Sequence, residues 1–215
     1  DNGVPASGNG ATNPFRELKG SVYEGGVRVP GVIEWPAAIP KPRVSSLNTV
    51  TSDLLPTLAA ITQQPLPDRP IDGINLLPLL ESNMKERDNP IFFWEYDTRA
   101  ELAVDREPYI APELQDGTTP LVKMMNGKYT RSFTNYRHPE IRETDYQGAR
   151  TVLSDRYKLV IDGGKDSGIE LFDIVNDPYE TTDLSTDLPA ITSTLKDQMN
   201  EWQHSVLNSL TGADY

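Results

Sequence analysis

The sequence predicts a mixed fold of strands and helices in two parts, the second of which is a small α+β unit. In the first part, a β-branched run is followed by apolar residues at helical spacing. In the second part, four strand candidates are followed by one long amphipathic helix, which is the order of an α+β unit. Between the two parts, residues 83–90 read NMKERDNP, a charged and polar stretch of the kind that separates domains.

The first part begins with a loop and continues with one strand and one helix. Residues 1–13 are rich in Gly and Asn, which predicts a loop. Residues 27–35, VRVPGVIEW, are alternating and β-branched, and they predict a strand interrupted at Pro30. Residues 52–63, SDLLPTLAAITQ, have apolar side chains three and four positions apart, and they predict a helix whose start accommodates Pro56.

The second part contains the strand candidates and one long segment without a clear pattern. Residues 91–96, IFFWEY, are strongly apolar and predict a strand. The runs ARTVLS and YKLVI, at 149–154 and 157–161, are separated by two residues and predict a hairpin. A further strand is predicted over residues 169–174, IELFDI, which run into the turn signal NDP. Residues 97–148 are polar, and we expect a long loop that carries short elements.

An apolar stripe near the end of the sequence predicts an amphipathic helix with Pro189 in its first turn. The stripe consists of Leu188, Ile191, Leu195, Trp202, Val206 and Leu210. We expect these side chains to form core rather than a ligand site. His204 lies between stripe positions, and we expect it to face solvent or the boundary of the core.

Composition excludes several classes of function. The formal net charge is −12 and the pI is about 4.6, which would repel a polyphosphate backbone, so we expect no nucleic-acid partner. There is no cysteine, and therefore no disulfide, zinc–thiolate site or cysteine nucleophile. With two histidines, His138 and His204, a multi-histidine zinc site is excluded, whereas oxygen-ligated hard cations remain possible. No run approaches the roughly 18 apolar residues that span a bilayer, so we expect no membrane partner.

A carboxylate and an amide stand side by side at the first two positions. Asp1 and Asn2 offer oxygen ligands of the kind that Ca²⁺ or Mg²⁺ takes. Because neighbouring side chains on a strand point to opposite faces, the two can share an ion only from a loop, and Gly3 suits a loop. The same DNG is equally typical of a plain turn, which from these residues alone is the commoner reading.

One lysine lies within a glycine-rich segment. Residues 16–31 read RELKGSVYEGGVRVPG, and the glycines around Lys19 allow a close backbone approach or positive φ angles, as an anion pocket requires. Taken alone, such a lysine is more often a solvated surface residue, and the glycines around it favour the anion pocket. Glu24 and Arg28 are four positions apart, and we expect them to pair and brace the loop.

A second group of cationic side chains lies in NYRHPEIR, within the long polar segment. Arg137, His138 and Arg142 could meet a second anionic group on a sugar substrate. The alternative is a solvated loop with a turn at His138-Pro139, which we favour from the residues alone.

The segment DNG followed by LKGSVYEGGVRVPGVIEWP resembles the type I sulfatases, the formylglycine-dependent sulfate-ester hydrolases of the alkaline phosphatase superfamily. The resemblance continues through SDLLPTLAAI at 52–61 and LPDRPIDGINLLPLL at 66–80. It returns at DRYKLV, 155–160, and at ELFDIVNDPYETTDL, 170–184. It thus extends over nearly the whole chain and is weakest across residues 97–148.

The resemblance implies a fold and a set of site residues. Residues 1–88 would be the C-terminal part of an α/β sandwich catalytic domain, and residues 89–215 a small α+β subdomain with an antiparallel sheet and a C-terminal helix. Asp1 and Asn2 would be calcium ligands. Lys19 would contact the sulfate and act in catalysis.

The sequence also departs from the family. It has no Cys or Ser in a C/S-x-P-x-R segment, from which the formylglycine nucleophile is made, and it lacks the paired aspartates that complete the calcium site. We therefore expect the C-terminal portion of a periplasmic or secreted sulfatase, with the N-terminal part of the same protein as its partner. The substrate of the complete protein would be a small sulfate ester, either a sulfated carbohydrate or an aryl sulfate. We expect the chain alone to be inactive. Two other readings stay open: a related phosphate or phosphonate ester hydrolase, and a non-catalytic module that binds sulfated glycans.

Overall fold

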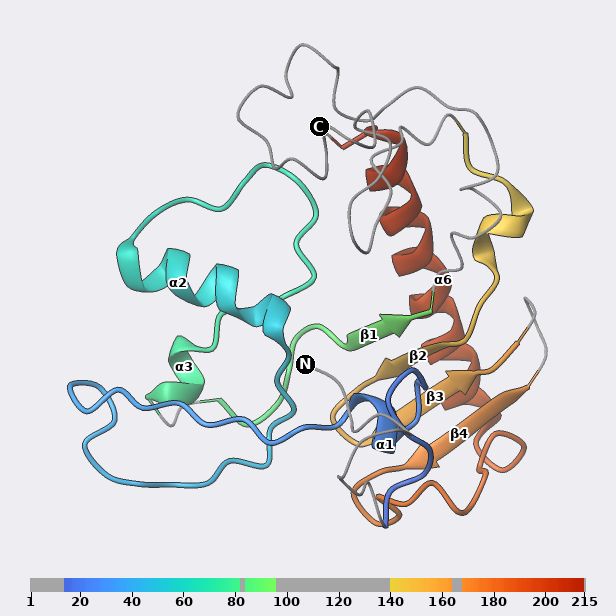
Figure 1. The fold of residues 1–215 in the computed structure, drawn as a ribbon, viewed down its shortest axis with the longest axis horizontal. Helices are drawn as coiled ribbons and strands as arrows, with labels where there is room; N and C mark the ends of the chain where they lie inside the picture. The colour runs from blue at the N-terminus through green and yellow to red at the C-terminus, as the bar shows by residue number, and fades with distance from the viewer. Residues whose placement is uncertain (1–13, 82–83, 96–139, 164–167, 215) are drawn as a thin grey trace, which may run out of the picture. The chain divides into compact units, whose positions relative to one another are not determined.

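A computed structural model describes residues 14–81, 84–95, 140–163 and 168–214 (Figure 1). The chain divides into two compact units, Asp1–Glu95 with Gly148–Trp202, and Tyr96–Gln147 with Gln203–Tyr215. The boundary expected after residue 88 stays a prediction. The fold class is confirmed as mixed α/β, with an antiparallel sheet and a C-terminal helix.

The first unit contains a four-stranded antiparallel sheet in the order β1-β2-β3-β4 (Figure 1). The strands are β1 Ile91–Trp94, β2 Arg150–Leu153, β3 Tyr157–Ile161 and β4 Ile169–Asp173. All four predicted strands are therefore confirmed, and β2 and β3 form the predicted hairpin. Its turn is closed where the Ser154 N–H donates to the Tyr157 carbonyl at 2.9 Å.

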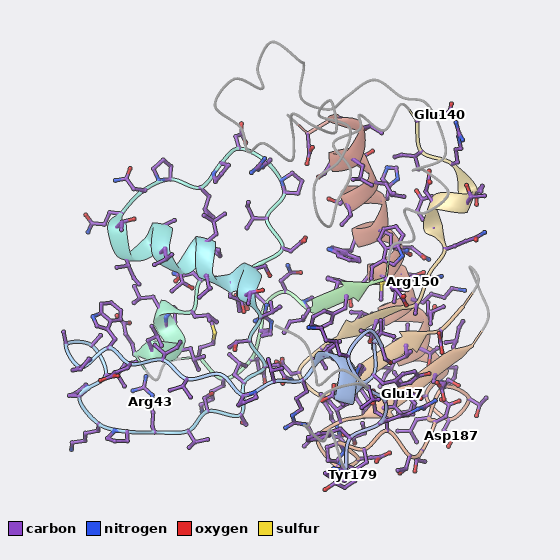
Figure 2. All side chains as sticks on the ribbon, in the orientation of Figure 1. Glu17, Arg43, Glu140, Arg150, Tyr179 and Asp187 are labelled. Carbon is purple, nitrogen blue, oxygen red and sulfur yellow. The ribbon has the colours of Figure 1, made fainter. Side chains whose placement is uncertain are left out.

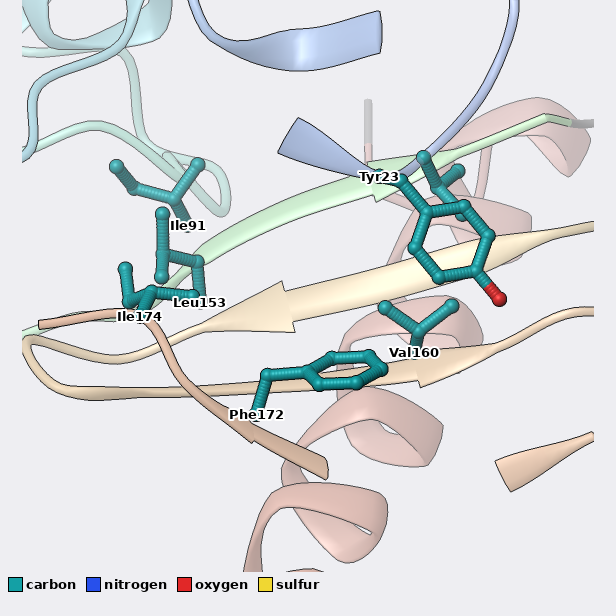
Figure 3. Close-up of a cluster of buried hydrophobic side chains, with 7 residues drawn as sticks. Tyr23, Ile91, Leu153, Val160, Phe172 and Ile174 are labelled. Carbon is teal, nitrogen blue, oxygen red and sulfur yellow. The ribbon is translucent and has the colours of Figure 1, made fainter. Parts of the chain in front are cut away.

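Strand alternation gives the sheet two buried faces. One face packs on the C-terminal helix through a cluster of Val152, Leu159, Ile161, Leu171, Leu195 and Met199. The other face packs on residues 22 and 23 through Val22, Tyr23, Ile91, Leu153, Val160, Phe172 and Ile174 (Figure 3). Residues 22 and 23 of the glycine-rich segment thus cover this second face of the sheet. They lie about 70 to 150 residues before the strand residues that they contact.

Helix α6, Pro189–Thr211, confirms the predicted C-terminal helix with Pro189 as its first residue. The most buried residues are Leu195, Met199, Gln203 and Leu207, four apart, so the inward face is centred on a line that includes Met199 and Leu207. Trp202 flanks this line and stacks on Phe92 of β1, with ring centroids 4.9 Å apart. The apolar side chains of this helix thus form part of the core, as expected.

The strand predicted over residues 27–35 does not form. Glu24–Val27 are a short helix, α1, and residues 28–35 form neither helix nor strand. Val32 and Ile33 are 92% and 53% exposed, and the described sheet consists of β1 to β4 without this segment. A β-branched run without a neighbouring strand has no partner for its backbone hydrogen bonds, which explains the wrong prediction.

The helix predicted over residues 52–63 is confirmed. A 3₁₀ turn, η1 Thr51–Asp53, leads into α2, Leu54–Thr62, and a second short helix, α3, follows at Leu77–Leu80. The apolar side chains of α2 do not enter the described core: Leu54, Leu55 and Leu58 are 53%, 48% and 57% exposed.

A buried ion pair ties the start of α2 to the segment before β1. Arg87 donates from Nη1 to Asp53 Oδ2 at 2.8 Å and from Nη2 to Asp53 Oδ1 at 3.0 Å. Asp53 also accepts the backbone N–H groups of Val50 and Ile74, each at 2.9 Å. Burial alone would raise the pKa of Asp53, but these hydrogen bonds outweigh burial and lower it.

In the second unit, the described residues form a 3₁₀ turn, η3 Glu143–Tyr146, and the end of α6. Asp145 Oδ2 accepts the Arg142 N–H at 2.7 Å. The exposed ring of His204 meets the Tyr146 hydroxyl at Nδ1, 3.1 Å away. The expectation that His204 faces solvent is confirmed.

Candidate functional site

Lys19 lies in a turn within the segment that we call the lysine loop, residues 16–23, and it is exposed. The next residue, Gly20, has φ 97°, a left-handed conformation that favours glycine. Glu17, which Figure 2 labels near α1, also has a positive φ, 63°. The loop is therefore tightly turned on both sides of Lys19.

The glycine pair of α1 lets the lysine loop lie directly on the helix. A Cβ atom on Gly25 would stand 2.1 Å from the Glu17 carbonyl oxygen, and one on Gly26 would stand 2.0 Å from that of Ser21. The Gly25 N–H donates to the Arg16 carbonyl at 2.8 Å. The close backbone approach predicted for these glycines is confirmed.

The two ends of the lysine loop meet on strand β4. Arg16 Nη1 donates to Glu170 Oε1 at 3.2 Å, and the Arg16 guanidinium lies 3.8 Å from the centre of the Tyr23 ring. The Tyr23 hydroxyl donates to Glu170 Oε2. Burial and this hydrogen bond to Glu170 raise the pKa of Tyr23, so the phenol remains protonated and can donate.

Immediately after the loop, Glu24 enters a buried ion triad with Lys158 and Glu180. Lys158 Nζ lies 3.0 Å from Glu24 Oε1 and 2.8 Å from Glu180 Oε1. The Glu24 N–H donates to Glu180 Oε2 at 2.7 Å. Burial raises the pKa of Glu180 despite the opposing effect of Lys158. Glu24 also pairs with Arg28 at 3.4 Å, which confirms the predicted brace.

Sequence reasoning missed Lys158 and Glu180 as partners of this segment. Both lie in motifs that carry the family resemblance, DRYKLV and NDPYE, but neither motif indicates what its charged residue contacts. A signal for Lys158 was present: it stands inside the apolar run YKLVI, where burial of the strand would force a lysine to find an acidic partner.

Of the other site residues predicted from the sequence, Arg142 is described: it is exposed, and its Nε donates to Glu140 Oε1 at 2.9 Å. The rest lie outside the described residues. This holds for Asp1 and Asn2 as metal ligands and for Arg137 and His138 as substrate-binding residues. The structure therefore neither unites them with Lys19 nor separates them from it. Within residues 14–81, 84–95, 140–163 and 168–214, no group of three or more His, Asp or Glu side chains could hold a metal ion.

Among the helices that the structure describes, none has both the length and the apolar character needed to span a bilayer.

Comparison of the sequence with known proteins identifies relatives of the chain. Steryl-sulfatase of Homo sapiens is 38% identical over 85 residues, which are 39% of this chain and 15% of that protein. Arylsulfatase A of Homo sapiens is 41% identical over 97 residues, 44% of this chain and 19% of that protein. No family model matches the chain.

The fold has a counterpart among solved structures. The crystal structure of Ps i-CgsB matches 94% of this chain and 34% of its own with a TM-score of 0.62 and 22% sequence identity, a likeness that concerns the fold alone. The two curated relatives are sulfatases, and the solved structure shares the mixed α/β fold of the chain. More particularly, they confirm the resemblance of the chain to the C-terminal portion of a sulfatase. The chain spans less than a fifth of the length of the two curated relatives.

Proposed function

We propose that the chain supplies part of the active site of a sulfatase that hydrolyses sulfate monoesters, with Lys19 as the sulfate-binding and catalytic lysine. The observation that carries the proposal is the seating of the lysine loop on Gly25 and Gly26. Backbone contacts fix the loop on both sides of Lys19 while its side chain stays exposed and accessible to an anion.

The chemistry assigns Lys19 a definite task. As the ester S–O bond breaks, negative charge develops on the sulfate oxygens and on the leaving oxygen, and a donor fixed in advance at that position lowers the barrier. An ammonium group is a compact charge with three donors and suits such an oxygen. A loop that is held from its backbone keeps the ammonium in place without reorganisation.

We propose Asp1 and Asn2 as ligands of a calcium ion. Their donor set fits the ion, because both offer oxygen atoms of the kind that hard cations take. When bound, the ion would act as a Lewis acid and bring a sulfate oxygen and the nucleophile together. Arg137 and His138 are proposed to meet a further anionic group of a sugar substrate.

We further propose that the nucleophile, a formylglycine, is carried by the N-terminal part of the same sulfatase, outside these 215 residues. The exposed apolar side chains of α2 and of residues 29–33 support such a partner, because apolar surface of this kind is normally covered. The chain alone is then inactive, and the whole protein is periplasmic or secreted. Its substrate is a sulfated carbohydrate or an aryl sulfate.

The replacement Lys19→Ala in the complete protein tests the role of the lysine. We expect kcat on an aryl sulfate to fall about a hundredfold or more, as for loss of one fixed donor in an oxyanion site. Lys41→Ala is the matched control, because Lys41 is also an exposed lysine but lies outside the loop, and it should keep full activity. A loss below about threefold for Lys19→Ala would refute the assignment.

The choice of substrate class is tested on the same protein. We expect a sulfate monoester to be cleaved faster than the phosphate monoester of the same alcohol. Faster cleavage of the phosphate ester would favour the related phosphate or phosphonate hydrolase. Binding of a sulfated glycan without hydrolysis would favour a non-catalytic module.

A further inference from the structure

We infer that Lys158 and Glu180 are positioning residues for Lys19: the buried ion triad that they form with Glu24 fixes the lysine loop on the sheet. This inference rests on the proposed function, because the position of the loop matters to catalysis only if Lys19 binds the sulfate ester.

The first step is that the lysine loop is attached to the sheet and not only to itself. Arg16 and Tyr23, at its two ends, both hydrogen-bond to Glu170 of β4. The Tyr23 ring is buried against Val160 and Phe172 on the face of the sheet opposite α6 (Figure 3). The exposed Lys19 is therefore carried between two anchored ends.

The second step is that the triad anchors the next residue, Glu24, more deeply than either end. Lys158 lies on β3, between the neighbouring strands β2 and β4, and its side chain is fully buried. Its ammonium group donates to Glu24 Oε1 at 3.0 Å and forms an ion pair with Glu180 Oε1 at 2.8 Å. Both carboxylates are buried as well, so each charge must keep its partner in place.

The third step is that the triad specifies a geometry. Glu180 has φ 55°, a left-handed conformation that is unfavourable for a residue with a side chain. In this conformation one carboxylate reaches both Lys158 Nζ and the Glu24 N–H. Glu180 thereby holds the backbone of Glu24, the first residue of α1, directly and its side chain through Lys158.

The fourth step connects the triad to Lys19. Gly25 and Gly26 follow Glu24 directly, and the backbone of the lysine loop lies against them with no side chain between. A movement of Glu24 must therefore carry the loop with it. A misplacement of about 1 Å in a catalytic group can cost on the order of a hundredfold in rate.

The test uses the complete protein and two ways of breaking the link. Glu24→Ala removes the triad residue that directly follows the lysine loop and leaves the buried Lys158–Glu180 pair intact. Lys158→Met combined with Glu180→Leu removes the two triad residues that lie outside α1, and it leaves the Glu24 carboxylate paired with Arg28. For both we expect kcat to fall about tenfold or more with KM changed less than about threefold, and amide exchange across residues 16–23 to become about tenfold faster.

Two further variants separate positioning from simple stability. Glu24→Gln keeps an amide oxygen that can accept from Lys158, and we expect it to recover most of the lost kcat. Asp53→Asn breaks a different buried ion pair whose described contacts involve no residue of the lysine loop. It should destabilise the protein without faster exchange in the loop.

The outcomes keep the two proposals apart. If breaking the triad changes neither loop exchange nor kcat while Lys19→Ala abolishes activity, the positioning role is wrong and the proposed function stands. If Lys19→Ala retains activity, the proposed function is wrong, and loop exchange still decides whether the triad holds the loop. If Asp53→Asn lowers kcat and loosens the loop as much as Glu24→Ala does, the triad has only a structural role.

Discussion

At the residue scale, two buried ion-pair sites stand out in the described part of the chain. Arg87 and Asp53 form a bidentate pair with side chains 2% and 0% exposed, and the fully buried Lys158 pairs with two carboxylates. Exposed pairs contribute little to stability, whereas removing one partner of a buried pair leaves an uncompensated charge. These residues are therefore the most sensitive to single substitutions.

Asp53→Asn should destabilise the protein by about 3–5 kcal/mol near neutral pH, because Arg87 would keep a buried charge without its partner. Denaturant unfolding of the wild type and the variant checks this loss of free energy of unfolding. A loss below about 1 kcal/mol would contradict it.

The stability contributed by Asp53 should also depend on pH. The folded-state pKa of Asp53 is lowered, so its contribution is complete above the unfolded pKa of about 3.9 and is lost as the pH falls through the folded pKa. A second carboxylate also has a lowered pKa, because hydrogen bonds from Arg156 lower the pKa of Asp173 to about 2. The difference between wild type and Asp53→Asn isolates Asp53: it should be constant from pH 5 to 7 and shrink below pH 4.

Residue roles could be predicted from the sequence where partners are local. The pairing of Glu24 with Arg28 followed from a spacing of four and is confirmed. The contacts of Lys158 with Glu24 and Glu180 could not be derived in the same way, since the two carboxylates lie 134 positions before it and 22 positions after it in the chain. No local pattern encodes a partner at such separations.

At the element scale, predictions that depend on local patterns are correct, and one that depends on a distant partner is wrong. Alternation and turn signals predicted the four strands of the sheet, and helical spacing predicted α2 and α6, because these patterns reflect local geometry. The run over 27–35 has the composition of a strand, but a strand also requires a neighbour, which composition does not reveal. The stripe predicted for α6 omitted Met199 and Leu207, which are fully buried, although both belong to the same inward face.

The contact between the lysine loop and α1 is open to a direct test at this scale. Gly26→Ala would place a Cβ atom 2.0 Å from the Ser21 carbonyl oxygen, so the loop backbone must move away. We expect activity of the complete protein to fall at least tenfold and exchange in residues 16–23 to rise. Gly31→Ala is the matched control, because a Cβ atom there meets nothing within 4 Å. Equal effects of the two substitutions would contradict the role of the close contact.

At the scale of the whole molecule, the described fold leaves several apolar side chains exposed. Leu54, Leu55 and Leu58 on α2 and Val32 and Ile33 in the preceding segment are all exposed by about half or more. Under the proposed function, the N-terminal part of the sulfatase would cover these side chains.

The central claim is that Lys19 meets the sulfate group beside a calcium ion held by Asp1 and Asn2. The most direct measurement is a crystal structure of the complete protein with calcium and a bound sulfate. We expect Lys19 Nζ within about 3.2 Å of a sulfate oxygen, which is hydrogen-bonding distance, and oxygen atoms of Asp1 and Asn2 within about 2.6 Å of the calcium ion. A sulfate bound in the active site with Lys19 on a different face of the molecule, or a calcium ion held without Asp1 and Asn2, would contradict the claim.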